Sequence, residues 1–530
     1  MDEFHWTEVD GVTTIWAGVS GPLRAQLLFR AGYGDETLIT HGQTHLIEHL
    51  AFSGLNNAGQ THGGFVNAVF TGFSTVGSDQ EVSDFLLHIC EALTSLLADR
   101  LESEKQILRA EEAARSSNVH DYLFRWRYGA KGYGLCNMPQ YGLRKVTIEQ
   151  LQNYSTQKFT RQNAVLWLSA PPPADLRLNL PEGVKCPIPR LEPILPAFPC
   201  WFVDDTSGGI AVGSTVPRSF AGPILCEIIT HRLYERLRTT HALSYNPMVN
   251  YFPLDADTAH VTVYADSPKD HREKLAKEFG ELIAGLGEIE PSEVENARQS
   301  LLKKMSGSLA PSPDDRRLAM LSAAAWAYLF GNKFETIEDL EAGYASVVAS
   351  DVSWIGFDLQ KTALFSLPGE AKLQACFGEK APFAIASAVK GRKIPHADAP
   401  INRERLVLSP EGVSHIWPDG SHLTVRYAEL AAAYYFEDGC VCLIGEDLCH
   451  VAVEPLLWRG GKDINREIRE QVPEQMLFAE GSRTPNAIPR PRTTAWQRIR
   501  AFISLNRRWS ILIFYIILFI ICYLALMYRK

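Results

Sequence analysis

Two stretches of the chain show the same succession of hydrophobic patterns. Each begins with short apolar runs of strand length, for example at residues 13–19 in the first stretch and 200–205 in the second. Each continues with a long segment, residues 83–101 and 271–289, in which apolar residues recur at the i, i+3, i+4 and i+7 spacing of an amphipathic helix. Strands followed by long helices in both stretches predict two α+β domains of a duplicated type.

A proline-rich segment and a change of pattern divide the rest of the chain. Residues 171–199 are dense in Pro and lack periodicity, which predicts an extended linker between a first domain at 1–170 and a second at 200–392. Residues 403–480 contain short, often alternating apolar runs separated by turn sequences, followed by a helix-like stretch. They predict a small β-domain closed by one helix, which resembles a pleckstrin-homology-like module.

The C-terminal end of the chain has the pattern of a membrane span. Residues 509–528 are 20 consecutive residues without a charge, which as a helix cover the roughly 30 Å of a bilayer core. The alternative is a buried core helix, but no face of this segment is polar enough to meet water. We therefore expect a single C-terminal transmembrane helix that inserts in the lipid bilayer.

The charges around this segment predict its orientation. Seven Arg lie in the linker at residues 481–508, whereas two cations follow the apolar segment, so the body of the chain should be cytoplasmic. The first residues, 1–11, have neither the basic nor the apolar region of a secretory signal. The basic linker either contacts anionic headgroups or serves as a spacer with topology signals.

Composition and charge exclude several protein classes. With 46% hydrophobic and 21% charged residues the chain is globular rather than collagen-like or wholly disordered. Ten Cys in 530 residues are too few for a disulfide-stapled scaffold. The net charge is −9, and because residues 481–530 hold nine cations and no acid, the preceding 480 residues carry −18. An acidic body argues against a dedicated nucleic-acid binder.

One histidine motif carries the strongest chemical signal. His45 and His49 are four residues apart, so on a helix their rings project from one face and can share a metal, with Glu48 at the edge of that face. This is the H-x-x-E-H inversion of the common zinc-peptidase motif. Thr40 as N-cap and Gly54 as stop support the helix. The alternative is an ordinary helix with two unconnected surface histidines.

A catalytic zinc site also needs a third protein ligand and an open position for water. Glu104 and Glu111 are seven residues apart, two helical turns, and so share one face of a helix that Ile107 and Leu108 would anchor to a core. Glu111 could complete a His2Glu site, while Glu104, which does not bind the metal itself, could orient one of the ligands by a hydrogen bond. The alternative is that both carboxylates belong to a solvated helix face.

These motifs together resemble the pitrilysin/insulinase family of zinc peptidases. In that family the two His and the distal Glu bind zinc, and the Glu of the histidine motif is the general base. The resemblance therefore implies that His45, His49 and Glu111 bind one Zn2+ per chain, that Glu48 is the base, and that Glu104 is a supporting carboxylate.

Two further segments match the family. The sequence GGFVNAVFTGFST resembles its Asn-Ala strand, which implies that Asn67 and Ala68 lie where substrate backbone pairs with a sheet edge. The sequence LRTTHALSYNP resembles a second-domain stretch, which implies that Arg238 and Tyr245 face a zinc site and contact substrate. Ala242 stands where the family commonly has Gly.

The resemblance covers about residues 10–370 and implies a zinc metalloendopeptidase that hydrolyses peptides or small unfolded proteins. The apolar segment at residues 509–528 adds the expectation that this enzyme is membrane-anchored. In family members of this size the Arg/Tyr pair acts on the opposite subunit, which implies a homodimer with shared sites. One alternative is a catalytically inert scaffold or assembly subunit that retains the peptidase fold at the membrane. Another is a lipid or partner sensor acting through residues 403–480.

Other motifs carry little chemistry. The chain has no Walker A loop, G-x-S-x-G elbow or G-x-G-x-x-G after a strand, so nucleotide-dependent and serine-hydrolase activities lack the residues that they need. Cys440, Cys442, Cys449 and His450 invite a zinc interpretation, but no second Cys-x-x-Cys pair accompanies them. We interpret them as ordinary strand residues.

Overall fold

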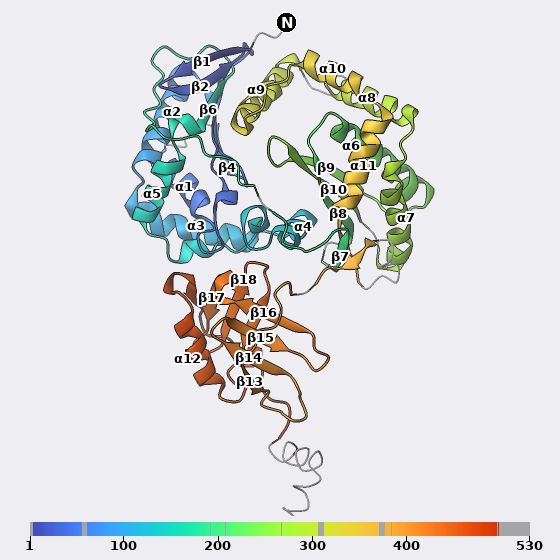
Figure 1. Ribbon diagram of the computed structural model, residues 1–530. Helices are drawn as coiled ribbons and strands as arrows, with labels where there is room; N and C mark the ends of the chain where they lie inside the picture. The colour runs from blue at the N-terminus through green and yellow to red at the C-terminus, as the bar shows by residue number, and fades with distance from the viewer. Residues whose placement is uncertain are drawn as a thin grey trace, which may run out of the picture. The chain divides into compact units, whose positions relative to one another are not determined.

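The computed structural model divides the chain into two compact units, residues 1–382 and 383–530 (Figure 1). The segments that it describes are residues 4–55, 61–190, 192–206, 208–266, 268–305, 312–369, 377–382 and 384–494, together with residue 497. The membrane span expected at residues 509–528 lies outside these segments. None of the helices within them combines the length and the apolar character needed to cross a membrane.

The first half of unit 1 is a six-stranded sheet with the order β1-β2-β6-β3-β5-β4. Its strands are β1 (His5–Val9), β2 (Val12–Trp16), β3 (Leu23–Phe29), β4 (Thr61–Val66), β5 (Thr71–Gly77) and β6 (Ala164–Leu168). Its helices are α1 (Gln43–Phe52), α2 (Asp79–Thr94), α3 (Leu101–Ala114), α4 (Val119–Tyr128) and α5 (Ile148–Lys158). The helical pattern of residues 83–101 thus spans two helices, because the chain leaves α2 near Leu96, whose backbone N–H donates to Gln152.

The second half of unit 1 is another six-stranded sheet, ordered β12-β7-β11-β8-β10-β9. Its strands are β7 (Cys200–Val203), β8 (Gly209–Pro217), β9 (Met248–Pro253), β10 (Thr258–Asp266), β11 (Leu364–Leu367) and β12 (Glu379–Lys380). Its helices are α6 (Ala221–Leu233), α7 (Arg272–Ala284), α8 (Pro291–Met305), α9 (Pro313–Phe330), α10 (Ile337–Ser346) and α11 (Ala349–Lys361).

The two halves repeat one topology. Five strands of each sheet match those of the other. Along the chain, the first of the five pairs in parallel with the last of the five: β2 with β6, and β7 with β11. That last strand then pairs antiparallel with β3 or β8, which continues through antiparallel neighbours to the edge strand β4 or β9. The predicted α+β class and the repeated order of strands and helices are therefore confirmed.

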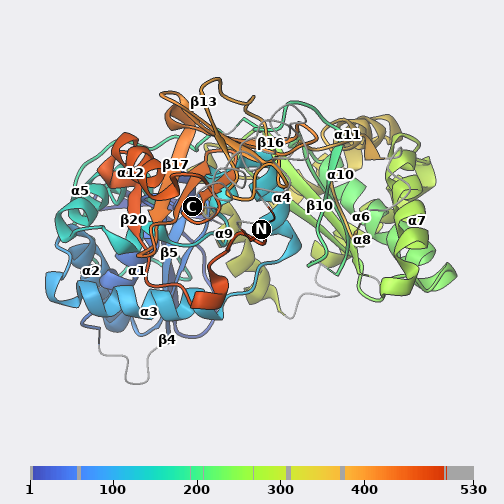
Figure 2. The ribbon, with the colours of Figure 1, turned by 90° about the horizontal axis from the view of Figure 1, so that it is seen from below.

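Each sheet is covered on one face by helices of its own half. The core of the first sheet includes side chains of α1, α2, α3 and α5, and that of the second includes side chains of α6, α7, α8 and α11. Figures 1 and 2 show these two groups of helices around their sheets. The alternation of apolar and polar positions in each helix produces this arrangement, because only the apolar stripe can be buried.

The opposite faces of the sheets are covered by helices that the halves exchange. Helix α9, from the second half, packs against β2 and β6 of the first sheet through Leu321 and Leu329. Helix α4, from the first half, packs against β8 and β11 of the second sheet through Val119 and Leu123. Each sheet therefore buries its second face only when both halves are present.

Arg127 of α4 holds this helix against the second half of unit 1 by polar contacts. Its side chain is 1% exposed, and its Nη2 donates to the carbonyls of Gly213 in β8, at 2.8 Å, and Thr362, at 2.6 Å. Thr362 is the C-cap of α11, where the helix dipole favours a cation. The guanidinium also lies 4.4 Å from the ring centroid of Phe198, a cation–π contact.

The described part of unit 2 contains two four-stranded sheets and one α-helix. The first sheet is antiparallel and consists of β13 (Arg392–Pro395), β14 (Arg405–Ser409), β15 (Gly412–Ile416) and β16 (His422–Arg426). The second consists of β17 (Leu430–Tyr435), β18 (Val441–Gly445), β19 (His450–Val453) and β20 (Leu477–Ala479). Helix α12 (Gly461–Gln471) packs Ile464 and Ile468 into the same core. Pairing of β13 with β14 shows that this unit includes residues ahead of position 403.

The three cysteines in the described part of unit 2 lie in or next to its strands. Cys440, Cys442 and Cys449 are buried free thiols, and Cys442 belongs to β18. His450 begins β19. Burial in the β-rich core accounts for these three thiols as packing residues.

Replacing Arg127 by Met should destabilise unit 1. The variant removes both carbonyl contacts while keeping much of the apolar volume, so we expect the free energy of unfolding to fall by about 3 kcal/mol. Urea denaturation of the full chain, followed by tryptophan fluorescence, measures this change. Arg109→Met, at an exposed position of α3, is the matched control and should change stability by less than about 0.5 kcal/mol. Equal stability of the two variants would contradict the role of Arg127.

Candidate active site

A buried carboxylate fixes the start of helix α1. Glu36 lies 2.9 Å from His41 Nδ1, and it accepts hydrogen bonds from the backbone N–H groups of Gly42, at 2.9 Å, and Thr44, at 2.7 Å. These donors are the free N–H groups of the helix N-terminus, where a negative charge is stabilising. The N-cap is Gly42 at φ 98°, a left-handed conformation that favours glycine. The prediction that Thr40 caps the helix was therefore wrong.

Helix α1 turns its two histidines away from the core. Leu46, Ile47 and Leu50 are fully buried against the first sheet, whereas the side chains of His45 and His49 are each 18% exposed. The imidazole rings lie with their centroids 4.9 Å apart and their planes perpendicular. The i, i+4 spacing thus places both rings on one side of the helix, as predicted.

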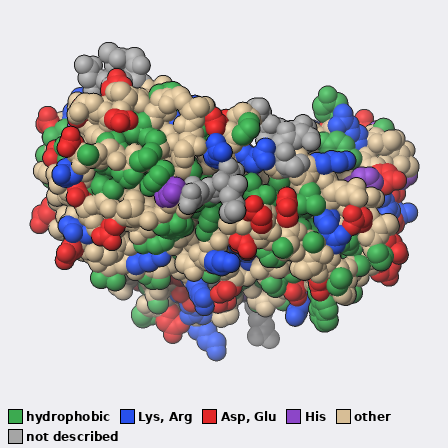
Figure 3. Space-filling view, turned by 90° about the horizontal axis from the view of Figure 1, so that it is seen from above, with side chains coloured by type: hydrophobic (Ala, Val, Ile, Leu, Met, Phe, Trp, Pro, Cys, Tyr) green, Lys and Arg blue, Asp and Glu red, His purple; other side chains and the backbone are tan. Residues whose placement is uncertain are grey.

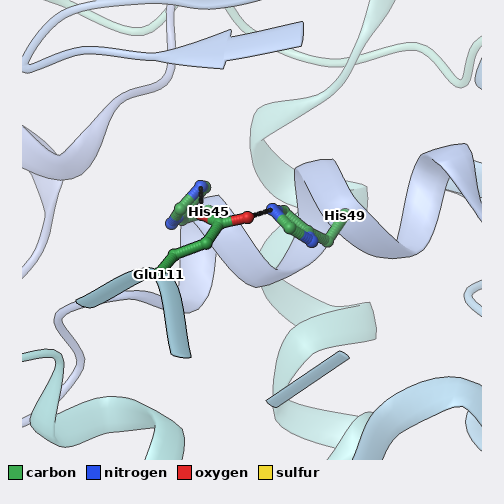
Figure 4. Close-up of side chains that lie close together, drawn as sticks. All are labelled: His45, His49 and Glu111. Atoms are coloured by element: carbon green, nitrogen blue, oxygen red, sulfur yellow. Dashed lines mark ion pairs between the residues drawn. The ribbon is translucent and has the colours of Figure 1, made fainter. Parts of the chain in front are cut away.

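Helix α3 brings Glu111 to the two histidines. Its carboxylate oxygens lie 3.8 Å from His45 Nε2 and 3.6 Å from His49 Nε2, and Figure 4 shows the carboxylate reaching towards both rings. Among the described residues, these three form the group whose ligand atoms, all within 4.8 Å of one another, could hold a metal ion. Leu108 anchors α3 in the core, whereas Ile107 is 43% exposed and does not act as the expected second anchor.

Glu48 lies beside the same point. Its Oε2 is 4.0 Å from His45 Nε2 and 3.8 Å from His49 Nε2, and the residue is 6% exposed. Burial, with a smaller contribution from the negative charge of Glu111, raises the pKa of the Glu48 carboxyl to about 8. Gly64 of β4 makes room for this carboxylate, because a Cβ at position 64 would lie 1.9 Å from Glu48 Oε1.

Glu104 contacts the ring nitrogen of His49 that faces away from Glu111. Its Oε2 lies 3.4 Å from His49 Nδ1, on the side of the ring opposite to Glu111. Arg100 donates to its Oε1 at 3.0 Å, and the Ser53 hydroxyl lies 3.5 Å from the same oxygen. A carboxylate at Nδ1 keeps the hydrogen there and leaves Nε2 free to bind a metal. The position of Glu104 thus matches the expected supporting role.

His45 has a different support, which the sequence motifs did not indicate. The amide Nε2 of Gln140 lies 3.2 Å from His45 Nδ1, and Arg115 Nη2 lies 3.3 Å from it. The other amide atom, Gln140 Oε1, is buried without a hydrogen bond. A half-turn of the amide would place this acceptor at His45 Nδ1, as metal binding through Nε2 requires.

The donor set fits a zinc ion. Bonds of about 2.05 Å at tetrahedral angles separate neighbouring ligand atoms by about 3.3 Å, so the observed 3.6 and 3.8 Å need only small shifts. Burial, together with the positive charges of His49 and Arg115, lowers the pKa of His45 to about 3. The ring is therefore neutral near pH 7, which metal binding requires. Two His and one Glu leave the fourth position of a catalytic zinc site open.

Asn67 and Ala68 occupy a turn rather than a free sheet edge. Asn67 Oδ1 accepts from the backbone N–H groups of Val69 and Phe70, and its carbonyl accepts from Tyr33. The carbonyl of Ala68 accepts from the backbone of Gly34. These groups already have partners, so the sheet edge near the site that could pair with a substrate is β4, which precedes Asn67.

Arg238 and Tyr245 lie together in the second half of unit 1. The Arg238 guanidinium is 5.1 Å from the ring centroid of Tyr245, whose side chain is 78% exposed. Ala242, between them, has φ 50°, a left-handed conformation in which Gly is favoured. Within the described part of unit 1, the contacts of this pair do not include His45, His49 or Glu111. The structure thus brings Arg238 and Tyr245 together, as expected.

Comparisons with known proteins find the fold but no sequence match. No family model matches the chain, and no curated protein matches it. A solved structure of a protease from Helicobacter pylori has a TM-score of 0.57 at 16% identity, covering 69% of this chain and 100% of that chain. The first half of the periplasmic protease PqqL from Escherichia coli has a TM-score of 0.55 at 12% identity, covering 71% and 93%.

A peptidase M16 inactive domain from Pseudomonas fluorescens shows a similar likeness. Its TM-score is 0.54 at 13% identity, covering 70% of this chain and 98% of that one. The fold expected from the pitrilysin/insulinase resemblance is therefore present over about seven-tenths of the chain: it is the fold of M16 peptidases.

Proposed function

We propose that the chain is a zinc metalloendopeptidase that hydrolyses peptides or small unfolded proteins. The observation that carries this proposal is the convergence of His45, His49 and Glu111 from two helices, with the buried carboxylate of Glu48 at 3.8 to 4.0 Å from both rings. A zinc ion at this point would supply a Lewis acid for the scissile carbonyl and lower the pKa of a bound water.

Glu48 has the position and the proton affinity of a general base. It would accept a proton from the attacking water and pass it to the leaving amine nitrogen. Burial raises the pKa of this carboxyl in the metal-free protein, whereas a zinc ion beside it would favour the ionised form, which is the form that accepts a proton from water. Glu104 and Gln140 would keep the two rings oriented while this happens.

The edge strand β4 offers a place for the substrate backbone. Among the described strands, β4 pairs only with β5, and it passes over Glu48 at Gly64. An extended peptide that adds to this edge would bring its carbonyl groups to the metal centre. Main-chain hydrogen bonds would then provide most of the affinity, with weak dependence on sequence.

We also propose a homodimer in which Arg238 and Tyr245 of one subunit act at the metal centre of the other. The exposure of Tyr245, which holds Arg238 against its ring, supports this sharing, because the pair is accessible to a partner chain. Arg238 would hold a substrate carbonyl or carboxylate, and Tyr245 would stabilise the oxyanion. We further propose that residues 509–528 anchor the chain in a membrane, with the catalytic units cytoplasmic.

The alternative function is a catalytically inert scaffold or assembly subunit at the membrane. The likeness to an M16 inactive domain favours it. Metal content separates the two proposals, because an inert scaffold has no need of a zinc ion at three converging side chains.

The zinc-loaded protein should hold one zinc per chain and cleave unfolded peptides. Glu48→Gln should keep the metal but lower kcat/KM by about 10³-fold, because it removes the base and not a ligand. Glu111→Gln should lose zinc, as measured by plasma mass spectrometry after dialysis. The control Glu102→Gln, exposed on the same helix, should behave as wild type. Metal-free and inactive wild-type protein would favour the scaffold instead.

Gly64→Ala should lower turnover without removing zinc. A Cβ at this position displaces the Glu48 carboxylate, so we expect kcat/KM to fall by about 10²-fold. Gly63→Ala, in the same edge strand, is the control, because its Cβ would meet only the Ser74 hydroxyl at 3.1 Å. Peptide cleavage and zinc content are measured for both variants. Full activity of Gly64→Ala would argue that Glu48 is not the base.

Mixing two inactive variants tests the shared sites. In a dimer of Glu48→Gln and Arg238→Ala chains, one site combines an intact metal centre with an intact Arg238. Random mixing of the two chains should therefore restore roughly a quarter of wild-type peptide cleavage. Each variant alone should stay inactive in the same assay. An inactive mixture would show that the pair does not act across the dimer.

A further inference from the structure

A cavity of about 300 Å³ adjoins the metal centre at the point where β4 ends. Its walls include Tyr33, His45, Val66, Asn67, Arg115, Asn137 and Gln140. Because His45 is both a wall residue and a metal ligand, a group in this cavity lies next to the bond that the centre would cleave. Its volume, at the lower end of the range for ligand sites, suits one side chain.

The wall at Asn137 is held rigidly. Its side-chain Nδ2 donates to Asp121 at 2.8 Å, and its carbonyl accepts from Arg125 at 2.6 Å. The carbonyl of Cys136 also accepts from Arg125, at 3.0 Å. These contacts fix the backbone on this side of the cavity, so its shape does not depend on a bound peptide.

The acidic side chain of the cavity wall, Glu36, already has partners for its charge, whereas the basic side chain, Arg115, contacts the proposed metal ligands. Glu36 is present in the wall, but its carboxylate is already satisfied by His41 Nδ1 and two backbone N–H groups of the start of α1. Arg115 provides the opposite charge. Its Nη2 lies 3.3 Å from His45 Nδ1 and 3.8 Å from Glu111 Oε2, so both of these contacts involve metal ligands.

Metal binding would weaken both contacts of Arg115. A His45 ring that binds metal through Nε2 carries a hydrogen at Nδ1, so this atom no longer accepts from the guanidinium. The charge of Glu111 is then shared with the metal. Arg115, which stays protonated, would be left as a cation at the cavity with donors in a planar fork that matches a carboxylate.

We propose that this cavity, the Arg115 pocket, binds the carboxylate of a substrate residue next to the scissile bond. This inference rests on the proposed peptidase function. It assigns a preference for Asp or Glu at one position, although the body of the chain is acidic. On the face shown in Figure 3, acidic and basic side chains are interspersed, so local charges rather than net charge determine which peptide group is attracted.

Peptide binding to the zinc-loaded full chain carrying Glu48→Gln tests the pocket without turnover. Cleavage products of the wild-type protein first locate the scissile bond of a model peptide. Amidated peptides with Glu, Gln or Lys at each flanking position are then titrated by fluorescence anisotropy. At one position we expect the Glu peptide to bind about tenfold more tightly than the Lys peptide, with Gln between them.

Substitutions of Arg115 then assign this preference. Arg115→Glu should reverse it in favour of Lys, Arg115→Gln should abolish it, and Arg115→Lys should retain it in part. The control Arg109→Glu, exposed on the same helix, should keep the wild-type preference. Zinc content is measured for every variant, so that a preference is compared only between loaded proteins.

Two results would overturn the Arg115 pocket. One is a preference for Glu that persists in loaded Arg115→Glu protein, and the other is a loaded wild-type protein that binds the Glu, Gln and Lys peptides equally. A second series with free C-termini distinguishes the source of the carboxylate: dependence on Arg115 only in that series would assign the pocket to a peptide C-terminus. Wild-type protein without zinc or cleavage would instead reject the peptidase function itself.

Discussion

The candidate metal centre depends on the packing of one helix against another. Helix α1 places Leu46 and Leu50 in the core of the first sheet, and the same spacing turns His45 and His49 to the opposite side. Helix α3, anchored by Leu108, then lies close enough for its own side chain to complete the set. Burial of apolar residues thus holds three ligand groups together before any metal contributes.

Burial also controls the charges at the centre. It lowers the pKa of His45 and raises that of Glu48, so near pH 7 the metal-free site avoids both a buried imidazolium and a fully ionised Glu48. A divalent cation would reverse this balance for the carboxyl, because a nearby positive charge favours the ionised form. Because a raised carboxyl pKa makes folding less favourable near pH 7, a bound cation would relieve a cost that the metal-free fold carries at Glu48.

Much of this centre follows from periodicity in the sequence. Helical spacing predicts that His45 and His49 share one face, whereas the meeting of Glu111 with these two residues was expected from the family resemblance. The support of His45 by Gln140 could not be predicted, because 95 residues separate the two and no local pattern relates them. The start of α1 was also missed, since the carboxylate of Glu36, close by in the sequence, accepts from the backbone there and Thr40 does not cap the helix.

The exchange of α4 and α9 has a further consequence for the Pro-rich segment at residues 171–199. This segment joins the two halves of unit 1 covalently, but the exchanged helices would hold the halves together even if it were cut. Each sheet contributes a helix to the other's buried face, through side chains such as Leu123 and Leu321. A protease that nicked this connector would leave two fragments that still co-purify. An isolated fragment of either half would expose a broad apolar surface and precipitate.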